Sequence, residues 1–380
     1  MLERLQRLLL LVRCLLAFLW RGKAVRAPEE PSVIVAVLSG KLGDVVCGTP
    51  VLRALKQRFP RARVIAAGGS VLAPLLADSG LANEYINIDA VSEVRLRSYE
   101  ADAAVLTGPS FAPAARLYLA GIPLVVAPRV VGGYCPFETW PYRVLKRLIS
   151  TYPYRMGEYA PRERLRSLEP LGIVSEDTKK YLGFSPAAEK KVKELFEREG
   201  IALGEFLVGV SVTAGNKIKE WPEERFAKVI DHLVETKRAR VLLIGGPDDA
   251  PRTERTLSLL SHPERVLNAQ GLFNIDELKA CISKLGLFIS VDTGPIYIAE
   301  AFNVPTVDIV GPLDEREQPP RGPFNRNVVP PYERMSQLHI LNARFYDRAE
   351  AERQTLSITV EAVVRETDAL VRDLRARQQG

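Results

Sequence analysis

The sequence has few of the residues that build metal centres and disulfide frameworks. It contains four cysteines and three histidines among 380 residues. The cysteines, Cys14, Cys47, Cys135 and Cys281, lie far apart and form no C-x-x-C pair. Zinc sites and disulfide scaffolds require such residues at short, regular spacing. We therefore expect no metal site, and a reducing, cytoplasmic location fits the cysteine usage.

The common nucleotide-binding motifs are also missing. Neither half of the chain carries G-x-G-x-x-G after its first expected strand, and G-x-x-x-x-G-K-[ST] is absent. These motifs hold dinucleotides and triphosphates through close backbone contacts. A dinucleotide oxidoreductase and a P-loop enzyme are therefore disfavoured. No repeat of solenoid length occurs either.

A membrane-spanning segment is not expected. The apolar run from Leu8 to Trp20 has thirteen residues and includes Arg13, whereas a spanning helix needs about 20. It lacks an A-x-A cleavage site typical of a signal peptide. Residues 1–30 are expected to form a basic amphipathic helix, which lies on a membrane surface or packs on the protein itself.

The excess positive charge is concentrated in this N-terminal segment. Residues 1–26 hold six of the 52 basic residues and one of the 46 acidic ones, which leaves a net charge of +1 for the remainder. A general nucleic-acid-binding surface is therefore not expected. Contact between residues 1–26 and an anionic membrane is the functional interpretation.

Two α/β domains are expected from the length and from the alternation of β-branched runs with helical patterns. The expected strands of the first half are Val33–Leu38, Arg63–Ala67, Tyr85–Ile88, Ala103–Thr107 and Leu124–Ala127. Those of the second half are Phe206–Val212, Arg240–Ile244, Val266–Ala269, Leu287–Val291 and Thr306–Val310. Residues 137–203 lose this pattern, and they end in a charged helical stretch at Ala187–Gly200. The expected divisions are domains at 31–185 and 205–355, a linker at 186–204 and a terminal helix at 356–380.

The first strand ends in a glycine-containing segment, SGKLGD, before a helix. Ligands bind at such strand ends in doubly wound folds. Lys41, Gly43 and Asp44 form this loop. Asp44 either caps the helix or presents a carboxylate that can take a proton from a hydroxyl group.

Three segments of the second half follow strands in the same way. Thr213 precedes Lys217 and Lys219, which are either ordinary surface lysines or ligands of a diphosphate. Asp248 follows a Gly-Gly-Pro turn and is placed to meet a ribose. Asp292, Thr293 and Gly294 open a helix whose N–H groups favour phosphate, although Asp292 alone reads equally as a cap. Together they indicate a nucleoside diphosphate.

These segments, in this order, resemble the heptosyltransferases of glycosyltransferase family 9. The resemblance rests on SGKLGDVVCGTPVLRALKQRFPRARV, KEWPEERFAKVIDHL, LLIGGPDD and SVDTGPIYIAEAFNVPTVDIVGP. It implies a glycosyltransferase B fold, with two Rossmann-like domains that face each other across a cleft. It further implies that the N-terminal domain binds the acceptor and the C-terminal domain the nucleotide-sugar.

The resemblance assigns roles to individual residues. Asp44 falls on the general base, Lys219 on the residue that meets the donor phosphates, and Asp248 on the acid that holds the ribose. Asp292, Thr293 and Gly294 fall on the loop that binds the diphosphate and sugar. Tyr297 stands where the family usually has histidine, and a tyrosine cannot be cationic near neutral pH.

The expected function is therefore inverting, metal-independent transfer of heptose from ADP-heptose to a lipid-linked glycan such as the lipopolysaccharide core. No cofactor is expected besides the donor substrate. The enzyme is expected at the inner face of the bacterial inner membrane. The alternatives are another nucleotide-sugar used for a different surface glycan, and a catalytically silent homologue that binds nucleotide-sugars.

Overall fold

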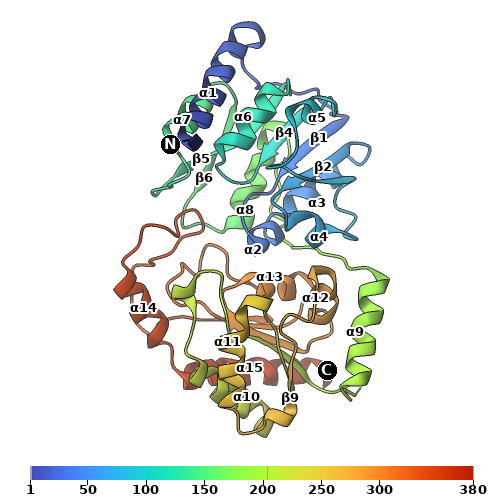
Figure 1. Ribbon diagram of the computed structural model, residues 1–380, viewed down its shortest axis with the longest axis vertical. Coiled ribbons are helices and arrows are strands. Elements are labelled where there is room, and N and C mark those ends of the chain that lie inside the picture. The colour runs from blue at the N-terminus through green and yellow to red at the C-terminus, as the bar shows by residue number, and fades with distance from the viewer. Residues whose placement is uncertain (1, 203, 380) are drawn as a thin grey trace. The chain divides into compact units, whose positions relative to one another are not determined.

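The computed structural model describes residues 2–202 and 204–379, so residues 1, 203 and 380 of the expected segments lie outside the description. The chain divides into two compact units. The first contains the residues up to Tyr181 together with Ile340–Asn342, and the second contains Leu182–His339 and the residues from Ala343 onwards. Each unit holds one parallel sheet covered by helices (Figure 1).

The sheet of the first unit has the strand order β3-β2-β1-β4-β5-β6. Its strands are β1 (Val33–Val37), β2 (Arg63–Gly68), β3 (Glu84–Asn87), β4 (Ala103–Leu106), β5 (Leu124–Val131) and β6 (Ser150–Arg155). All neighbouring strands pair in parallel. The near-continuous burial of β1 and β4 follows from helices on both faces of the sheet.

The sheet of the second unit repeats this arrangement, with the order β12-β11-β10-β7-β8-β9. Its strands are β7 (Leu207–Ser211), β8 (Arg240–Leu243), β9 (Val266–Asn268), β10 (Leu287–Val291), β11 (Thr306–Ile309) and β12 (Asn325–Val328). They also pair in parallel throughout. Both sheets therefore have the doubly wound order expected of Rossmann-like domains.

Helices connect the strands in both units. Those of the first unit are α1 (Leu2–Arg21), α2 (Leu42–Val46), α3 (Thr49–Arg58), α4 (Leu72–Leu76), α5 (Glu93–Arg97), α6 (Phe111–Leu119), α7 (Trp140–Leu145), α8 (Ala160–Leu165) and the 3-10 helix η1 (Arg166–Leu171). Those of the second unit are α9 (Pro186–Arg198), α10 (Glu223–Lys237), α11 (Ala250–Ser258), α12 (Ile275–Ile282), α13 (Gly294–Ala301), α14 (Arg348–Ser357) and α15 (Val360–Gln379). Three short 3-10 helices, η2 (Lys217–Lys219), η3 (Pro247–Asp249) and η4 (Pro263–Arg265), also belong to the second unit.

The α/β class and the strands expected from sequence are confirmed to within a few residues, but one edge strand of each sheet differs from expectation. β6 lies in the segment 137–203, where we expected no strand, and β12 had no expected counterpart. β6 contains Pro153 and several polar residues, and β12 reads Asn-Arg-Asn-Val. Edge strands tolerate proline and polar residues, which hides them from a pattern built on apolar runs.

The segment expected as a linker is largely helical. Ser185 caps α9 by accepting a hydrogen bond from the amide of Ala188. Val192 and Leu195 of α9 are buried, and α9 packs against α12. These residues therefore belong to the second unit, whose described part begins near Leu182.

The N-terminal helix α1 packs on the first unit. Leu11 and Cys14 are buried in the same core as Val35 and Leu106 of the sheet. Tyr118 donates a hydrogen bond of 2.6 Å to the carbonyl of Gly22, just after α1. The expectation that α1 packs on the protein is thus confirmed for one face of the helix. None of the described helices is both long enough and apolar enough to cross a membrane.

Candidate functional site

The candidate residues gather at the switch point of each sheet. In the first sheet the connections from β1 and β4 leave in opposite directions, and in the second those from β7 and β10 do the same. Crevices at the carboxyl ends of such strands are the usual ligand sites of doubly wound folds. The Asp44 segment follows β1, the Lys219 segment follows β7, and Asp292 follows β10.

In the first unit, Asp44 is held by a buried arginine. Arg164 of α8 donates one hydrogen bond of 2.8 Å to Oδ1 of Asp44 and another of 2.9 Å to its backbone carbonyl. The Arg164 side chain is 4% exposed and that of Asp44 is 24% exposed. Burial acts to lower the pKa of Arg164, but the charge of Asp44 and other groups raise it above its ordinary value. This contact fixes the carboxylate while one side of it remains open to solvent.

The other carboxylate oxygen of Asp44 caps α2. The amide of Lys41 donates to Oδ2 of Asp44 over 3.0 Å. Gly40 has a φ of +112°, and a Cβ at this position would lie 2.4 Å from Asp44, so only glycine fits. Gly43 is buried within α2, and Lys41 is exposed. Asp44 thus has the capping role foreseen from sequence. Its two oxygens offer about four acceptor positions, and the side chain keeps 24% of its surface exposed.

In the second unit, Lys219 is held against Asp292. Its Nζ lies 2.7 Å from Oδ2 of Asp292 and also donates to the Asp292 carbonyl. The Lys219 side chain is 14% exposed, whereas that of Asp292 is 5% exposed. Two residues after Lys219, the buried Trp221 donates to the carbonyl of Ile358 over 2.9 Å. The tryptophan therefore anchors the segment that carries the lysine.

Asp292 is not the cap of α13, because the cap position is occupied by Thr293. Its second oxygen, Oδ1, accepts a hydrogen bond from the hydroxyl of Tyr297. Tyr297 is almost fully buried. The hydrogen-bonding tip of this tyrosine is therefore directed at Asp292. Thr293 and Gly294 lie half-buried at the start of α13, where N–H groups favour an anion.

The remaining predicted residues follow neighbouring strands of the second sheet, Thr213 after β7 and Asp248 after β8. Thr213 is buried just after β7. In η3 the two acids differ: Asp249 accepts a hydrogen bond of 2.7 Å from the amide of Gly246, and Asp248 is exposed. Asp249 therefore shapes the turn, while Asp248 is accessible to a ligand.

Two residues of these sites had not been foreseen. Arg164 lies in an arginine-rich segment that gave no sign of which arginine is buried. Asp308 interrupts the apolar strand β11, which was a usable signal. Among the described residues, neither carboxylate oxygen of Asp308 has a hydrogen-bond partner. Burial, and then the negative charge of Asp292, raise the pKa of Asp308 well above its ordinary value.

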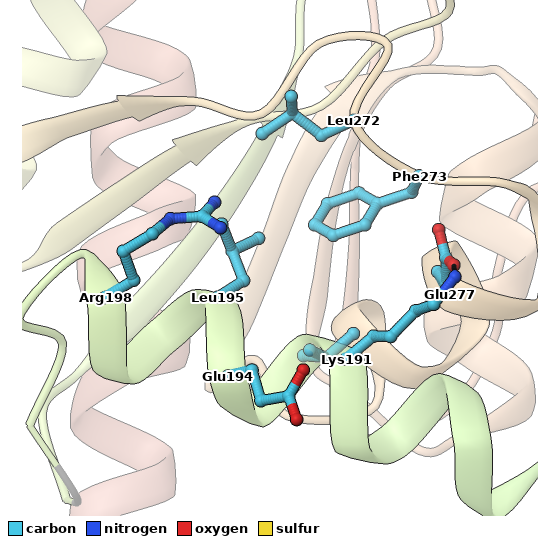
Figure 2. Close-up of a pocket in the computed structure, with 8 residues that line it drawn as sticks. Lys191, Glu194, Leu195, Arg198, Leu272, Phe273 and Glu277 are labelled. Carbon is cyan, nitrogen blue, oxygen red and sulfur yellow. Dashed lines mark hydrogen bonds and ion pairs between the residues drawn. The ribbon is translucent and has the colours of Figure 1, made fainter.

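A pocket elsewhere in the second unit is separate from these residues. It has a volume of about 280 Å³ and lies between α9 and the connection from β9 to α12. Figure 2 shows Lys191 reaching from α9 toward Glu277, to which it is bonded over 2.7 Å. Phe273 lines the same pocket. None of the residues predicted from sequence lines it, so it is not the candidate site.

Known proteins of one family are similar to this chain. Residues 163–344 match the model of glycosyltransferase family 9 (heptosyltransferase). The lipopolysaccharide heptosyltransferase 3 of Escherichia coli strain K12 is 24% identical over 285 residues, which cover 72% of this chain and 80% of that protein. The match with the family model covers just under half of the chain, and the chain is similar to the heptosyltransferases of this family. It is therefore a glycosyltransferase.

Solved structures agree on the fold of this glycosyltransferase. Escherichia coli ADP-heptose lps heptosyltransferase II superposes with a TM-score of 0.69 at 18% identity, covering 90% of this chain and 99% of that one. A family 9 glycosyltransferase from Veillonella parvula gives a TM-score of 0.67 at 20% identity, covering 79% and 87%. The glycosyltransferase B fold expected from the resemblance is confirmed.

Proposed function

We propose that this glycosyltransferase transfers heptose from ADP-heptose to a lipopolysaccharide-core acceptor or a related lipid-linked glycan. The names of its relatives support the donor and the acceptor. The observation that carries the proposal is the pairing of Lys219 with Asp292, 73 residues apart in sequence, at the switch point of the second sheet. A cation held beside the start of a helix there suits a diphosphate.

In the proposed step, Asp44 accepts the proton of the acceptor hydroxyl. The freed oxygen attacks the anomeric carbon from the face opposite the leaving group, so the configuration inverts. The bond between that carbon and the diphosphate oxygen breaks, and the nucleoside diphosphate departs with the electron pair. The partly exposed carboxylate of Asp44 is suited to receiving this proton.

The donor is proposed to lie across the carboxyl edge of the second sheet. Lys219 and the first N–H groups of α13, at Thr293 and Gly294, stabilise the charge that develops on the diphosphate. Asp248 binds the ribose hydroxyls, and Thr213 contacts the diphosphate. Asp292 keeps the lysine in place, and Tyr297 keeps Asp292 in place.

We propose that the step requires no metal ion, because the lysine and the helix amides supply the positive charge that the leaving group needs. Turnover that persists at full rate after treatment with a strong chelator is the expected result. Loss of turnover that returns when a divalent cation is added would contradict this part of the proposal.

We also propose that the enzyme works at the cytoplasmic face of the inner membrane, where residues 1–26 contact an anionic surface. The concentration of basic residues in this segment supports the assignment. A lipid-linked acceptor remains in the bilayer, so the enzyme must come to it.

The test is a panel of nucleotide-sugars offered to the purified protein, with thermal stabilisation and product formation measured for each. A ligand that binds only the folded state at about 100 times its Kd adds roughly 2.7 kcal/mol. We expect an ADP-sugar to stabilise the protein most. Stabilisation by another nucleotide-sugar would identify a different donor, and binding without turnover on any acceptor would identify a silent homologue.

A further inference from the structure

One face of the helix α1 is packed on the first unit, and the opposite face is exposed. Its inner face carries Leu11 and Cys14, which are buried against α6 and α7 of the first unit. At its C-terminal end, Arg21 donates a hydrogen bond of 2.6 Å to the carbonyl of Ile122, and its guanidinium lies 4.3 Å from the centre of the Tyr118 ring. Figure 1 shows α1 beside α6 and α7. The helix is therefore a fixed part of the domain.

The outer face of α1 is apolar and exposed. Eight exposed large apolar side chains form this face, hereafter the outer face, and they are Leu5, Leu8, Leu9, Val12, Leu15, Leu16, Leu19 and Trp20. They recur at spacings of three and four residues, which places them on one stripe. Leu19 is 72% exposed and Trp20 is 80% exposed. A surface helix normally turns polar residues toward water, so a continuous apolar stripe of this kind marks a binding surface.

Positive charge borders this stripe at both ends. At the N-terminal end Arg4, Arg7 and Leu8 line a pocket of about 370 Å³ together with Trp140 of α7. Trp140 is 58% exposed. At the C-terminal end Arg21, Lys23, Val25 and Arg26 line a second pocket, of about 460 Å³, together with Gly121 and Pro123. The sequence has no acidic residue between Arg4 and Pro28.

This charge pattern decides which partner fits. If a second copy packed on the outer face in the antiparallel sense, Arg4 and Arg7 would meet Lys23 and Arg26. In the parallel sense, each cationic end would meet its own counterpart. Like charges brought together in an interface oppose association. An anionic bilayer offers an apolar layer for the stripe and phosphate groups for both ends.

We propose that α1 docks flat on an anionic bilayer through its outer face, with lipid headgroup phosphates bound in the two cationic pockets at its ends. This inference rests on the proposed membrane association and specifies the surface responsible. Trp20 and Trp140 occupy the headgroup level, where tryptophan is favoured. A helix of 20 residues is about 30 Å long, so the two pockets would bind separate lipids.

The packing of α1 determines how the proposal must be tested. Deletion of residues 1–26 would remove Leu11, Cys14 and Ala24 from the core and could unfold the first unit. Arg4, Arg7 and the residues of the outer face are exposed. Substitutions at these positions leave the buried core unchanged, so the fold is retained. The full-length chain is therefore compared with Leu16→Gln/Leu19→Gln and with Arg4→Gln/Arg7→Gln.

The measurement is co-sedimentation with vesicles of phosphatidylglycerol and phosphatidylcholine, and with phosphatidylcholine alone. We expect each leucine substitution to weaken binding about ten-fold and each arginine substitution about five-fold. Binding should also weaken as salt is added. Matched controls are Val174→Gln, at an exposed apolar residue, and Lys190→Gln/Lys193→Gln on the exposed face of α9, which should bind as the unmodified protein does.

Tryptophan fluorescence gives a second measurement. The chain has three tryptophans, and Trp221 is buried, so lipids with brominated acyl chains should quench Trp20 and Trp140 only. The docking geometry is supported if Trp20→Phe and Trp140→Phe each lose part of the quenching seen in the unmodified protein. If the unmodified protein ignores anionic vesicles, the membrane association itself is wrong. If it binds and the outer-face variants bind equally well, membrane association stands and this docking surface is wrong.

Discussion

Each unit contains a partly exposed charged residue paired with a more buried counter-ion, and the signs of the two charges are reversed between the units. In the first, an accessible carboxylate, Asp44, is held by a more buried cation, Arg164. In the second, an accessible cation, Lys219, is held by a more buried carboxylate, Asp292. In each pair the residue with the proposed chemical role is the more exposed partner, and its counter-ion lies deeper in the protein.

This arrangement follows from the cost of burying charge. A buried ion needs a partner and further hydrogen bonds to compensate for lost hydration. Arg164 also donates to the Asp44 carbonyl, and Asp292 also accepts from Tyr297. The deep partner is thereby fixed in one position, and it holds the accessible partner in place. If this comparison is correct, substitution of an exposed partner should mainly lower turnover, whereas substitution of a buried partner should lower both turnover and the stability of the fold.

The largest effect is expected for Asp44→Asn. The amide keeps the size of the side chain and cannot act as a base, so kcat should fall about 10²- to 10⁴-fold. Donor binding should be unchanged because the second unit is not altered. Steady-state kinetics with the cognate donor and calorimetric donor titration measure the two quantities. A loss of donor affinity equal to the loss of turnover would mean that Asp44 has no separate role as a base.

Lys219→Ala should affect both turnover and donor affinity. Removal of one donor that stabilises developing charge lowers kcat about 10²- to 10³-fold. Lys217→Ala is a suitable control, because Lys217 is in the same 3-10 helix, is 69% exposed and pairs with Glu220. The same donor titration and turnover assay apply to both variants. Equal losses in the two variants would show that general positive charge, and no specific lysine, serves the donor.

Arg164→Met tests a buried partner. The substitution removes the ion pair of Asp44, and hydrogen bonds to charged groups are worth about 2 kcal/mol, so a lower unfolding midpoint is expected. A misplaced base should also reduce kcat by about 10²-fold, with donor affinity unchanged. Arg162→Met, at an exposed arginine of the same helix, should leave both quantities as they were. An unchanged kcat in Arg164→Met would show that this arginine does not position Asp44 for catalysis.

The residues at strand ends could be foreseen from sequence more readily than Arg164. Asp44, Lys219 and Asp292 each follow an apolar strand and precede a helix, and doubly wound folds place such positions at the ligand-binding edge. The parallel order of both sheets also followed from the alternation of apolar strands and amphipathic helices. These features depend on local sequence alone.

Arg164 could not be foreseen because its burial depends on contacts 120 residues apart. The segment around it contains several arginines, and no local pattern distinguishes the buried one. The two faces of α1 were ambiguous for a related reason. Apolar residues surround much of this helix, so the sequence supported both packing and membrane contact, and tertiary packing with α6 and α7 selected the inner face.

The smallest effect is expected for Asp308→Asn. Burial and the nearby charge of Asp292 raise the pKa of Asp308, so the folded protein holds a proton that the unfolded chain releases at lower pH. Asp308 contributes its full stabilisation at pH values below the ordinary carboxyl pKa, where both states are protonated. This contribution to the free energy of unfolding is lost as the pH rises through the raised pKa of the folded state. The folded protein should therefore lose stability toward alkaline pH.

The asparagine variant lacks this titration. Its free energy of unfolding should vary less between mildly acidic and mildly alkaline pH, and it should gain relative to the unmodified protein as pH rises. Denaturant unfolding across this range measures the slope, and Glu194→Gln, at an exposed carboxylate of α9, should leave the slope unchanged. An unaltered slope in Asp308→Asn would mean that Asp308 is charged in the folded state. The second unit would then hold two buried negative charges beside one lysine, and the simple pairing of one deep counter-ion with one accessible residue would hold only in the first unit.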